Sequence, residues 1–234
     1  MENKRTLRRT TPKVSNSSRK LTKNILYPTY YWKVKLSDKE TDRLKLIDET
    51  YRLENEDKAG IQRSNIGGWH SHNFLHHNRV FDGLFNAIFN IIDNNIIKKD
   101  YKILNEMFRN QNNQWQAGKL ETEGGWVNIN RNDNLNMEHA HDGNWLSAAF
   151  YIKVPDVNDT NRIGLFEFKD PIPARIHEGH LFGKQNHYTI TPEEGMLIIF
   201  PAWVRHMVSP NYTNQDRISF SCNIKYPVIR EINK

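Results

Sequence analysis

The chain has 234 residues, of which 37% are hydrophobic and 26% charged, a composition typical of one globular domain with a buried core. No apolar run approaches the roughly 20 residues of a membrane helix, and a single cysteine, Cys222, excludes an internal disulfide and a thiolate-cluster zinc site. Residues 1–24 contain eight Lys or Arg and one acid, a net charge of +7, whereas the whole chain has +6. Residues 25–234 therefore sum to 6 − 7 = −1.

The basic segment 1–24 is also rich in Ser, Thr and Asn, and we predict that it is a disordered, solvated tail. Nucleic-acid binding stays open for this tail and is not expected for the nearly neutral body. No apolar segment follows the N-terminal charges, so we expect no export signal, no membrane association and a cytoplasmic location. Residues 25–234 are predicted to form a single domain.

The first part of that domain begins with a strand and a helix. Residues 25–36 are rich in β-branched and aromatic residues, which favours a strand. Ser37 and Glu40 have the spacing of a capping box, and apolar residues at helical spacing after them predict a helix over about 38–56. Turn residues followed by aromatics predict a loop or short strand over 63–75.

A second helical region has the strongest periodicity in the chain. From residue 78 to residue 96, apolar side chains recur at i, i+3, i+4 and i+7. A further helix is predicted over about 100–110. We expect the helical layer, about 37–110, to pack its apolar stripe against one face of a sheet.

Beyond Gln114 the pattern changes to short apolar runs separated by Gly, Pro, Asn and Asp. The predicted strands are 115–119, 126–130, 138–141, 146–154, 164–168, 187–190, 196–200, 206–209 and 217–225. Helices followed by many short strands indicate an α+β chain, whose part from about 114 to 226 forms a sandwich or barrel of the jelly-roll kind.

Three histidines in this second part have the spacing of a metal site. His139 and His141 stand two residues apart on an extended segment, so their rings point to the same side. His206, on a distant predicted strand, offers a third ligand. The spacing alone is a weak signal, because His70 and His72 share it. His139 and His141 differ from that pair because they lie among predicted strands of a jelly roll, and such strands converge inside the barrel.

The chemistry that this pattern suits is oxygen activation at non-haem iron. Such Fe(II) takes protein ligands on one face and keeps open positions on the other, and its usual ligands are two His and one carboxylate. Arg217 follows His206 by eleven residues and begins another predicted strand. Its guanidinium is suited to bind the far carboxylate of an oxo-acid through paired hydrogen bonds.

Several motifs occur in a characteristic order. They are Ser64 to Trp69, Trp126-Val-Asn128, His139-Ala-His141, Leu146-Ser147 with Tyr151, Gly164 to Pro171, Gly195 through Phe200-Pro201, His206, and Arg217 through Asn223. Over residues 126–226 this set resembles the double-stranded β-helix core of the Fe(II)/2-oxoglutarate-dependent oxygenases, most of all a branch common in phages and marine bacteria. Each motif is weak alone, and their order makes the set specific.

The resemblance implies a metal site with one departure from the family pattern. His139 and His206 take the places of the two His ligands, and His141 takes the place where most of the superfamily has Asp or Glu. Three neutral imidazoles leave a formal charge of +2, where a carboxylate would give +1. A nearby carboxylate as the third ligand stays open, although Glu138 and Asp142 face the other side of an ideal strand.

The resemblance also implies a co-substrate site and an activity. Arg217 and Ser219 bind the distal carboxylate of 2-oxoglutarate, and Tyr151 matches a position that often hydrogen-bonds the same group. The expected enzyme is a dioxygenase that couples oxidative decarboxylation of 2-oxoglutarate to hydroxylation of a small-molecule or peptide substrate. Residues 25–234 then form one oxygenase domain, located in the host cytoplasm if a phage encodes it.

Two other functions stay open at this point. A three-His, cupin-like dioxygenase would need no 2-oxoglutarate, and a non-enzymatic jelly-roll protein would hold a structural metal or none. The segment 171–186 is long enough to be a lid, in which His177 and His180 either contact substrate or lie on a mobile surface. The substrate, the oligomeric state and the outcome of oxidation are not predicted.

Overall fold

The computed structural model describes residues 29–99, 114–117, 119–172, 187–226 and 229–232. The tail predicted over 1–24, the helix predicted over about 100–110 and most of the proposed lid lie outside these residues. Within the described ranges, no helix has the length and hydropathy needed to cross a membrane.

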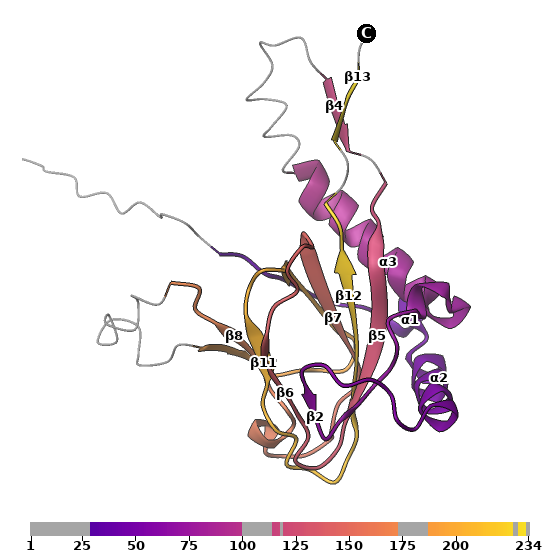
Figure 1. Ribbon diagram of the computed structural model, residues 1–234, viewed down its shortest axis with the longest axis vertical. Coiled ribbons are helices and arrows are strands. Elements are labelled where there is room, and N and C mark those ends of the chain that lie inside the picture. The colour runs from indigo at the N-terminus through magenta and orange to yellow at the C-terminus, as the bar shows by residue number, and fades with distance from the viewer. Residues whose placement is uncertain (1–28, 100–113, 118, 173–186, 227–228, 233–234) are drawn as a thin grey trace, which may run out of the picture.

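Two antiparallel sheets form the body of the protein (Figure 1). The larger runs β1 (Trp32–Lys35), β10 (Met196–Pro201), β7 (Leu146–Lys153), β12 (Arg217–Ile224), β5 (Thr122–Asn130) and β3 (Trp69–His70). The smaller runs β2 (Asn65–Ile66), β6 (Leu135–His139), β11 (His206–Val208), β8 (Phe166–Lys169) and β9 (His187–Ile190), and a separate ribbon pairs β4 (Gln114–Ala117) with β13 (Ile229–Ile232). The predicted α+β double-stranded β-helix is confirmed.

The strands agree with the sequence prediction except at a few ends. Each strand predicted beyond Gln114 is present, but β6 ends at His139, so His141 lies two residues past the strand rather than within it. The segment 63–75 contains β2 and β3, one on each sheet, and thereby connects the two sheets beside β5 and β6. The ribbon strand β13 was not predicted.

Strand β12 has the hydrophobic core on one face and, on the other, the odd-numbered residues Arg217, Ser219 and Ser221, which line a cavity. Its even-numbered residues from Ile218 to Ile224 join the hydrophobic core beneath the helices. The ring of Phe220 meets the ring of Phe85 edge-on at 5.2 Å between centroids. At Gly125, on the neighbouring strand, an added Cβ would lie 2.7 Å from Phe85, so the lack of a side chain lets the helix approach the sheet.

The helical layer covers the outer face of the larger sheet (Figure 1). It consists of α1 (Asp38–Thr41), α2 (Arg43–Glu56) and α3 (Asp82–Ile92), and a π-helical turn over Asp93–Ile97 follows α3. The helix predicted over 38–56 is therefore interrupted at Asp42, whose φ of 43° is left-handed. The predicted capping box forms, because Glu40 accepts hydrogen bonds from the Ser37 amide at 2.8 Å and hydroxyl at 2.7 Å.

Candidate active site

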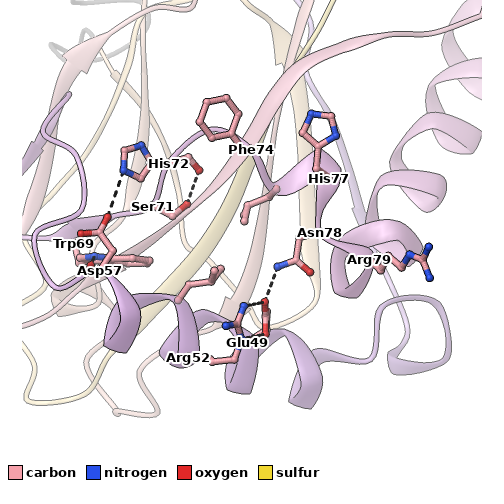
Figure 2. Close-up of a pocket in the computed structure, with 12 residues that line it drawn as sticks. Glu49, Arg52, Asp57, Trp69, Ser71, His72, Phe74, His77, Asn78 and Arg79 are labelled. Atoms are coloured by element: carbon pink, nitrogen blue, oxygen red, sulfur yellow. Dashed lines mark hydrogen bonds and ion pairs between the residues drawn. The ribbon is translucent and has the colours of Figure 1, made fainter.

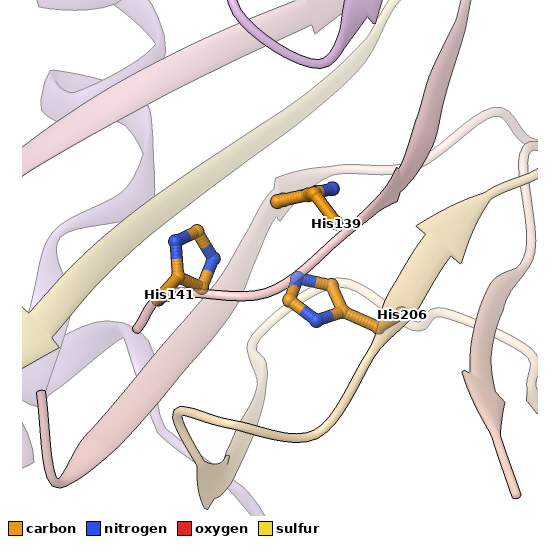
Figure 3. A group of neighbouring side chains, drawn as sticks. All are labelled: His139, His141 and His206. Atoms are coloured by element: carbon orange, nitrogen blue, oxygen red, sulfur yellow. The ribbon is translucent and has the colours of Figure 1, made fainter. Parts of the chain in front are cut away.

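Three imidazoles meet between the two sheets (Figure 3). His139 ends β6, His206 begins β11, and the two are register partners across these antiparallel strands. Their ring centroids lie 4.3 Å apart, and the ring of His141 lies 5.0 Å from that of His139 and 5.1 Å from that of His206. One nitrogen from each ring lies within 4.8 Å of the other two, a separation that suits binding to one ion.

Backbone carbonyls orient two of the three rings. His139 Nδ1 donates to the carbonyl of Met137 at 2.7 Å, and His206 Nδ1 donates to the carbonyl of Val204 at 3.0 Å. In a neutral imidazole this arrangement leaves Nε2 as the free electron-pair donor, the usual state of a metal-binding histidine.

The surroundings of the triad keep its rings neutral. Burial, reinforced by His139 and His70, lowers the pKa of His141 to about 4. Burial is also the main cause that lowers the pKa of His139 and brings that of His206 well below its ordinary value. At neutral pH the three nitrogens are therefore available as ligands rather than occupied by protons.

No carboxylate lies among these imidazoles in the described part of the chain. The side chain of Glu138 points away from the triad, where it pairs with Lys169 Nζ at 2.8 Å and with Arg205. Asp142 is exposed. Neither carboxylate lines the cavity that contains the triad, so the described ligand set consists of imidazoles alone.

The triad lines a cavity between the sheets. The described lining residues are Ser64, Trp126, Asn128, Asn136, His139, His141, Ala148, Ala149, Tyr151, Phe166, Phe200, His206, Val208, Arg217, Ser219 and Ser221. All three residues predicted to bind the co-substrate therefore line the same cavity as the three predicted metal ligands.

Arg217 is buried in this cavity without an anionic partner. Its side chain is 1% exposed; Nε donates to the Gly164 carbonyl at 2.9 Å and Nη1 donates to Ser219 Oγ at 3.2 Å. Its guanidinium also lies over the ring of Tyr151, 5.1 Å from the centroid. No described carboxylate forms an ion pair with it. A buried charge is costly when it is unpaired, so this arginine is suited to bind an anion.

The hydroxyl of Tyr151 is a second unpaired group near this arginine. Its oxygen is buried and has no hydrogen-bond partner among the described residues. Burial raises the pKa of Tyr151 to about 12, although Arg217 opposes that shift, so the phenol keeps its proton and can donate it in a hydrogen bond. Together the two side chains offer several donors to one anionic ligand.

Gly164 has a role that the sequence did not reveal. Its φ is +73°, and a Cβ at this position would lie 2.9 Å from Cδ of Arg217. Glycine therefore permits both the turn and the close approach of the arginine to the Gly164 carbonyl. A glycine at the first position of the predicted strand 164–168 was the available signal, but it did not identify the contact.

His70 lies closer to the triad than its sequence position suggested. It is 4% exposed on the edge strand β3, its ring stacks on Trp126 at 5.7 Å, and its Nδ1 donates to the Ser71 carbonyl at 2.6 Å. Burial is the main cause that lowers its pKa to about 4, and His139 adds to the shift. The sequence offered only one sign of a role for His70, namely its spacing of two residues from His72. His72 itself is exposed, so the spacing did not identify a shared site.

A second pocket lies between α2 and the segment that follows β3 (Figure 2). His72 and His77 are on its wall with Glu49 and Asp57. These acids already have partners, because Asp57 pairs with His72 at 3.4 Å and Glu49 pairs with Arg52 at 2.7 Å. Among the described residues, the only group suited to hold a metal is the triad, which lies outside this pocket.

Comparison with known proteins agrees with the fold and with the family resemblance. Residues 124–223 match the family model described as "Putative 2OG-Fe(II) oxygenase". No curated protein is similar enough in sequence to count as a match.

Solved structures with the same fold have low sequence identity to this chain. A prolyl-4-hydroxylase from Pseudomonas putida has a TM-score of 0.52 at 13% identity, covering 86% of this chain and 94% of its own. HygX from Streptomyces hygroscopicus, with nickel, 2-oxoglutarate and hygromycin B bound, has a TM-score of 0.52 at 11% identity, covering 85% and 83%. A Trichoplax adhaerens prolyl hydroxylase, in complex with a hypoxia inducible factor peptide fragment, has a TM-score of 0.50 at 11% identity, covering 84% and 83%.

At these identities the solved structures establish the fold, and the family match covers the strands that carry the site. The resemblance seen in the sequence is thus confirmed: residues 124–223 have the sequence pattern of the 2OG-Fe(II) oxygenases, on the double-stranded β-helix of that family.

Proposed function

We propose that the chain is an Fe(II)/2-oxoglutarate-dependent dioxygenase that acts as a hydroxylase, within one domain over residues 25–234. The supporting observation is the cavity between the sheets. It is lined by three neutral imidazoles and by a buried Arg217 that has no described anionic partner. A metal ion and a dicarboxylic acid are the two ligands that these groups are suited to bind.

The donor set of the triad fits Fe(II). His139 and His206 each have Nδ1 bonded to a carbonyl and Nε2 free, and His141 lies within reach of both. Three protein ligands leave positions open for a co-substrate and dioxygen. Bound iron would supply the oxygen activation that side chains cannot provide, whereas the protein orients the reactants and excludes water.

The part of the cavity lined by Arg217 and Tyr151 fits one carboxylate of 2-oxoglutarate. Arg217 and the phenol of Tyr151 are both buried donors, and Ser219 fixes the guanidinium by accepting a hydrogen bond at 3.2 Å. A carboxylate bound here would neutralise the buried charge and accept the proton of the free phenol. Because a bound carboxylate would pair with the buried charge of Arg217, the site favours a diacid over a neutral analogue.

The remaining lining residues suit a substrate with a neutral polar group. Asn128 and Ser221 line the cavity together with Phe166 and Phe200, and no described Asp or Glu lines it. A cationic substrate would therefore have no described acid to pair with beside the metal. We propose a peptide or small molecule that presents an uncharged group for hydroxylation.

A three-His dioxygenase that needs no 2-oxoglutarate is the second candidate, and the all-imidazole ligand set favours it. The two functions differ in what they require of Arg217. The first predicts succinate formation that depends on the arginine, whereas the second predicts substrate oxidation without succinate and without need of the arginine.

The experiment is an assay of succinate formation after anaerobic loading with Fe(II), with and without 2-oxoglutarate and air. The proposal predicts succinate only when iron, 2-oxoglutarate and dioxygen are all present, at a slow rate without substrate and a higher rate with the correct member of a peptide and metabolite panel. Absence of succinate from an iron-loaded protein under all these conditions would exclude the 2-oxoglutarate-dependent reaction.

A further inference from the structure

We propose that Glu138 is a positioning residue for the metal site, because it joins the three strands that carry and support His139 and His206. The inference rests on the proposed metal-binding function and assigns to Glu138 a role other than ligand. Glu138 precedes His139 on β6, and Arg205 directly precedes His206, the first residue of β11. The carboxylate pairs with Arg205 and, at 2.8 Å, with Lys169 on β8.

These charged residues lie beside a row of paired positions across the smaller sheet. His206 is the register partner of His139 on one side and of Phe168 on the other. Glu138, Arg205 and Lys169 each adjoin a member of that row. Because side chains alternate along a strand, the three charges project from the face opposite the imidazoles.

The backbone pairing between the two metal-bearing strands is short. Strand β11 has three residues, and only two of them, His206 and Val208, have register partners on β6, with an irregularity between them. A ladder of this length gives little resistance to sliding or separation of the strands. The Glu138–Arg205 ion pair links β6 with the segment entering β11, next to the pair of imidazoles whose separation determines metal affinity.

The carboxylate also separates two like charges. The amide of Lys169 donates to the carbonyl of Arg205 at 2.9 Å, so these two cationic residues are cross-strand neighbours. Like charges on neighbouring strands are destabilising when no counter-charge is present. Both cations contact the Glu138 carboxylate, which therefore supplies the counter-charge between them.

Most exposed salt bridges contribute little to stability. The ion pairs of Glu138 differ from these because they lie next to the proposed metal ligands. Glu138 is 25% exposed and binds two cations at once, while its neighbour on the chain is a proposed ligand. Loss of the carboxylate would leave two cations facing each other behind the ligands, so the expected effect is on metal affinity more than on global stability.

The test measures Co(II) binding by the metal-free protein, followed by the cobalt absorption, for wild type and Glu138→Gln. Loss of a group that supports a ligand typically costs about 10–100-fold in metal affinity, and we expect about 10-fold here. The loss should shrink at about 1 M salt, where the Debye length is about 3 Å and the repulsion is screened. Glu138→Gln/Lys169→Gln should regain most of the affinity, because one of the two facing cations is gone.

The matched control is Glu123→Gln, which removes an exposed ion pair with Lys225, at 3.5 Å, away from the triad. It should bind Co(II) as wild type does. Equal Co(II) affinity of wild type and Glu138→Gln would overturn the positioning role, even if the variant melts at a lower temperature. A wild-type protein that binds no Co(II) at all would instead overturn the proposed metal site, and the role of Glu138 with it.

Discussion

His139 and His206 lie opposite each other as register partners on β6 and β11, with ring centroids 4.3 Å apart. A metal bound by both would bridge two strands that share only a short ladder. Metal binding and the stability of this part of the fold should therefore be coupled, because an ion that binds only the folded state stabilises it.

Replacement of one ligand tests that coupling. His206→Ala should weaken Co(II) or Fe(II) binding by at least about 100-fold, beyond the roughly 10–100-fold expected for an outer supporting group. It should also abolish the increase in melting temperature on adding metal. His72→Ala is the matched control, since the His72 side chain is 59% exposed and belongs to the second pocket. Similar metal affinities for the two variants would contradict the assignment of the triad.

Arg217→Met separates binding from stability. The substitution removes hydrogen bonds from a charged donor, each of which contributes roughly 1.5–3 kcal/mol, so 2-oxoglutarate affinity should fall by at least about 10-fold. The metal-free variant should be as stable as wild type or more stable, because an unpaired buried charge is replaced by an apolar side chain. Calorimetric titration and thermal melts measure the two effects. Unchanged 2-oxoglutarate affinity would favour the three-His dioxygenase that needs no oxo-acid.

Gly164→Ala should disturb the same arginine without removing it. The added Cβ would lie 2.9 Å from Arg217 Cδ at a backbone φ of +73°, so strain and displacement act together. We expect a loss of about 1–3 kcal/mol in the free energy of unfolding, and weaker 2-oxoglutarate binding with little change in metal affinity. Denaturant unfolding and ligand titration provide the measurements. A variant with wild-type affinity for the oxo-acid would show that Arg217 does not depend on this contact.

The buried His70 should make stability depend on pH. Its pKa falls from about 6.5 in an unfolded chain to about 4 in the fold, so between these values the unfolded state binds more protons. The contribution of His70 to the free energy of unfolding is complete above pH 6.5. It falls by roughly 3 kcal/mol as the pH is lowered to 4. Metal-free wild type should lose stability over this window more steeply than His70→Gln, as measured by chemical denaturation. Equal slopes would show that His70 is not held neutral by the fold.

The regular parts of the fold follow from local sequence. The short apolar run at 217–225 predicted β12, and the capping box at Ser37 and Glu40 marked the start of the helical layer. Asp42 broke the expected helix because its left-handed backbone separates α1 from α2, and its residue type alone gives little indication of that conformation.

The site was predictable to the extent that its residues share a motif. His139 and His141 were found from their spacing, and Arg217 from its place after His206. His70 and Gly164 depend on contacts between distant segments, namely the stacking of His70 on Trp126 and the approach of Arg217 to the Gly164 carbonyl. No local pattern encodes such contacts, which is why the sequence did not predict them.

The most direct measurement is an anaerobic titration of the purified protein with Fe(II) and then with 2-oxoglutarate, followed by visible absorption. The proposed site predicts a metal-to-ligand charge-transfer band that appears only when both are present, because the oxo-acid then chelates the iron. The band should be absent in His206→Ala and require much more 2-oxoglutarate in Arg217→Met. An iron-loaded wild-type protein that shows no band at saturating 2-oxoglutarate would contradict the account.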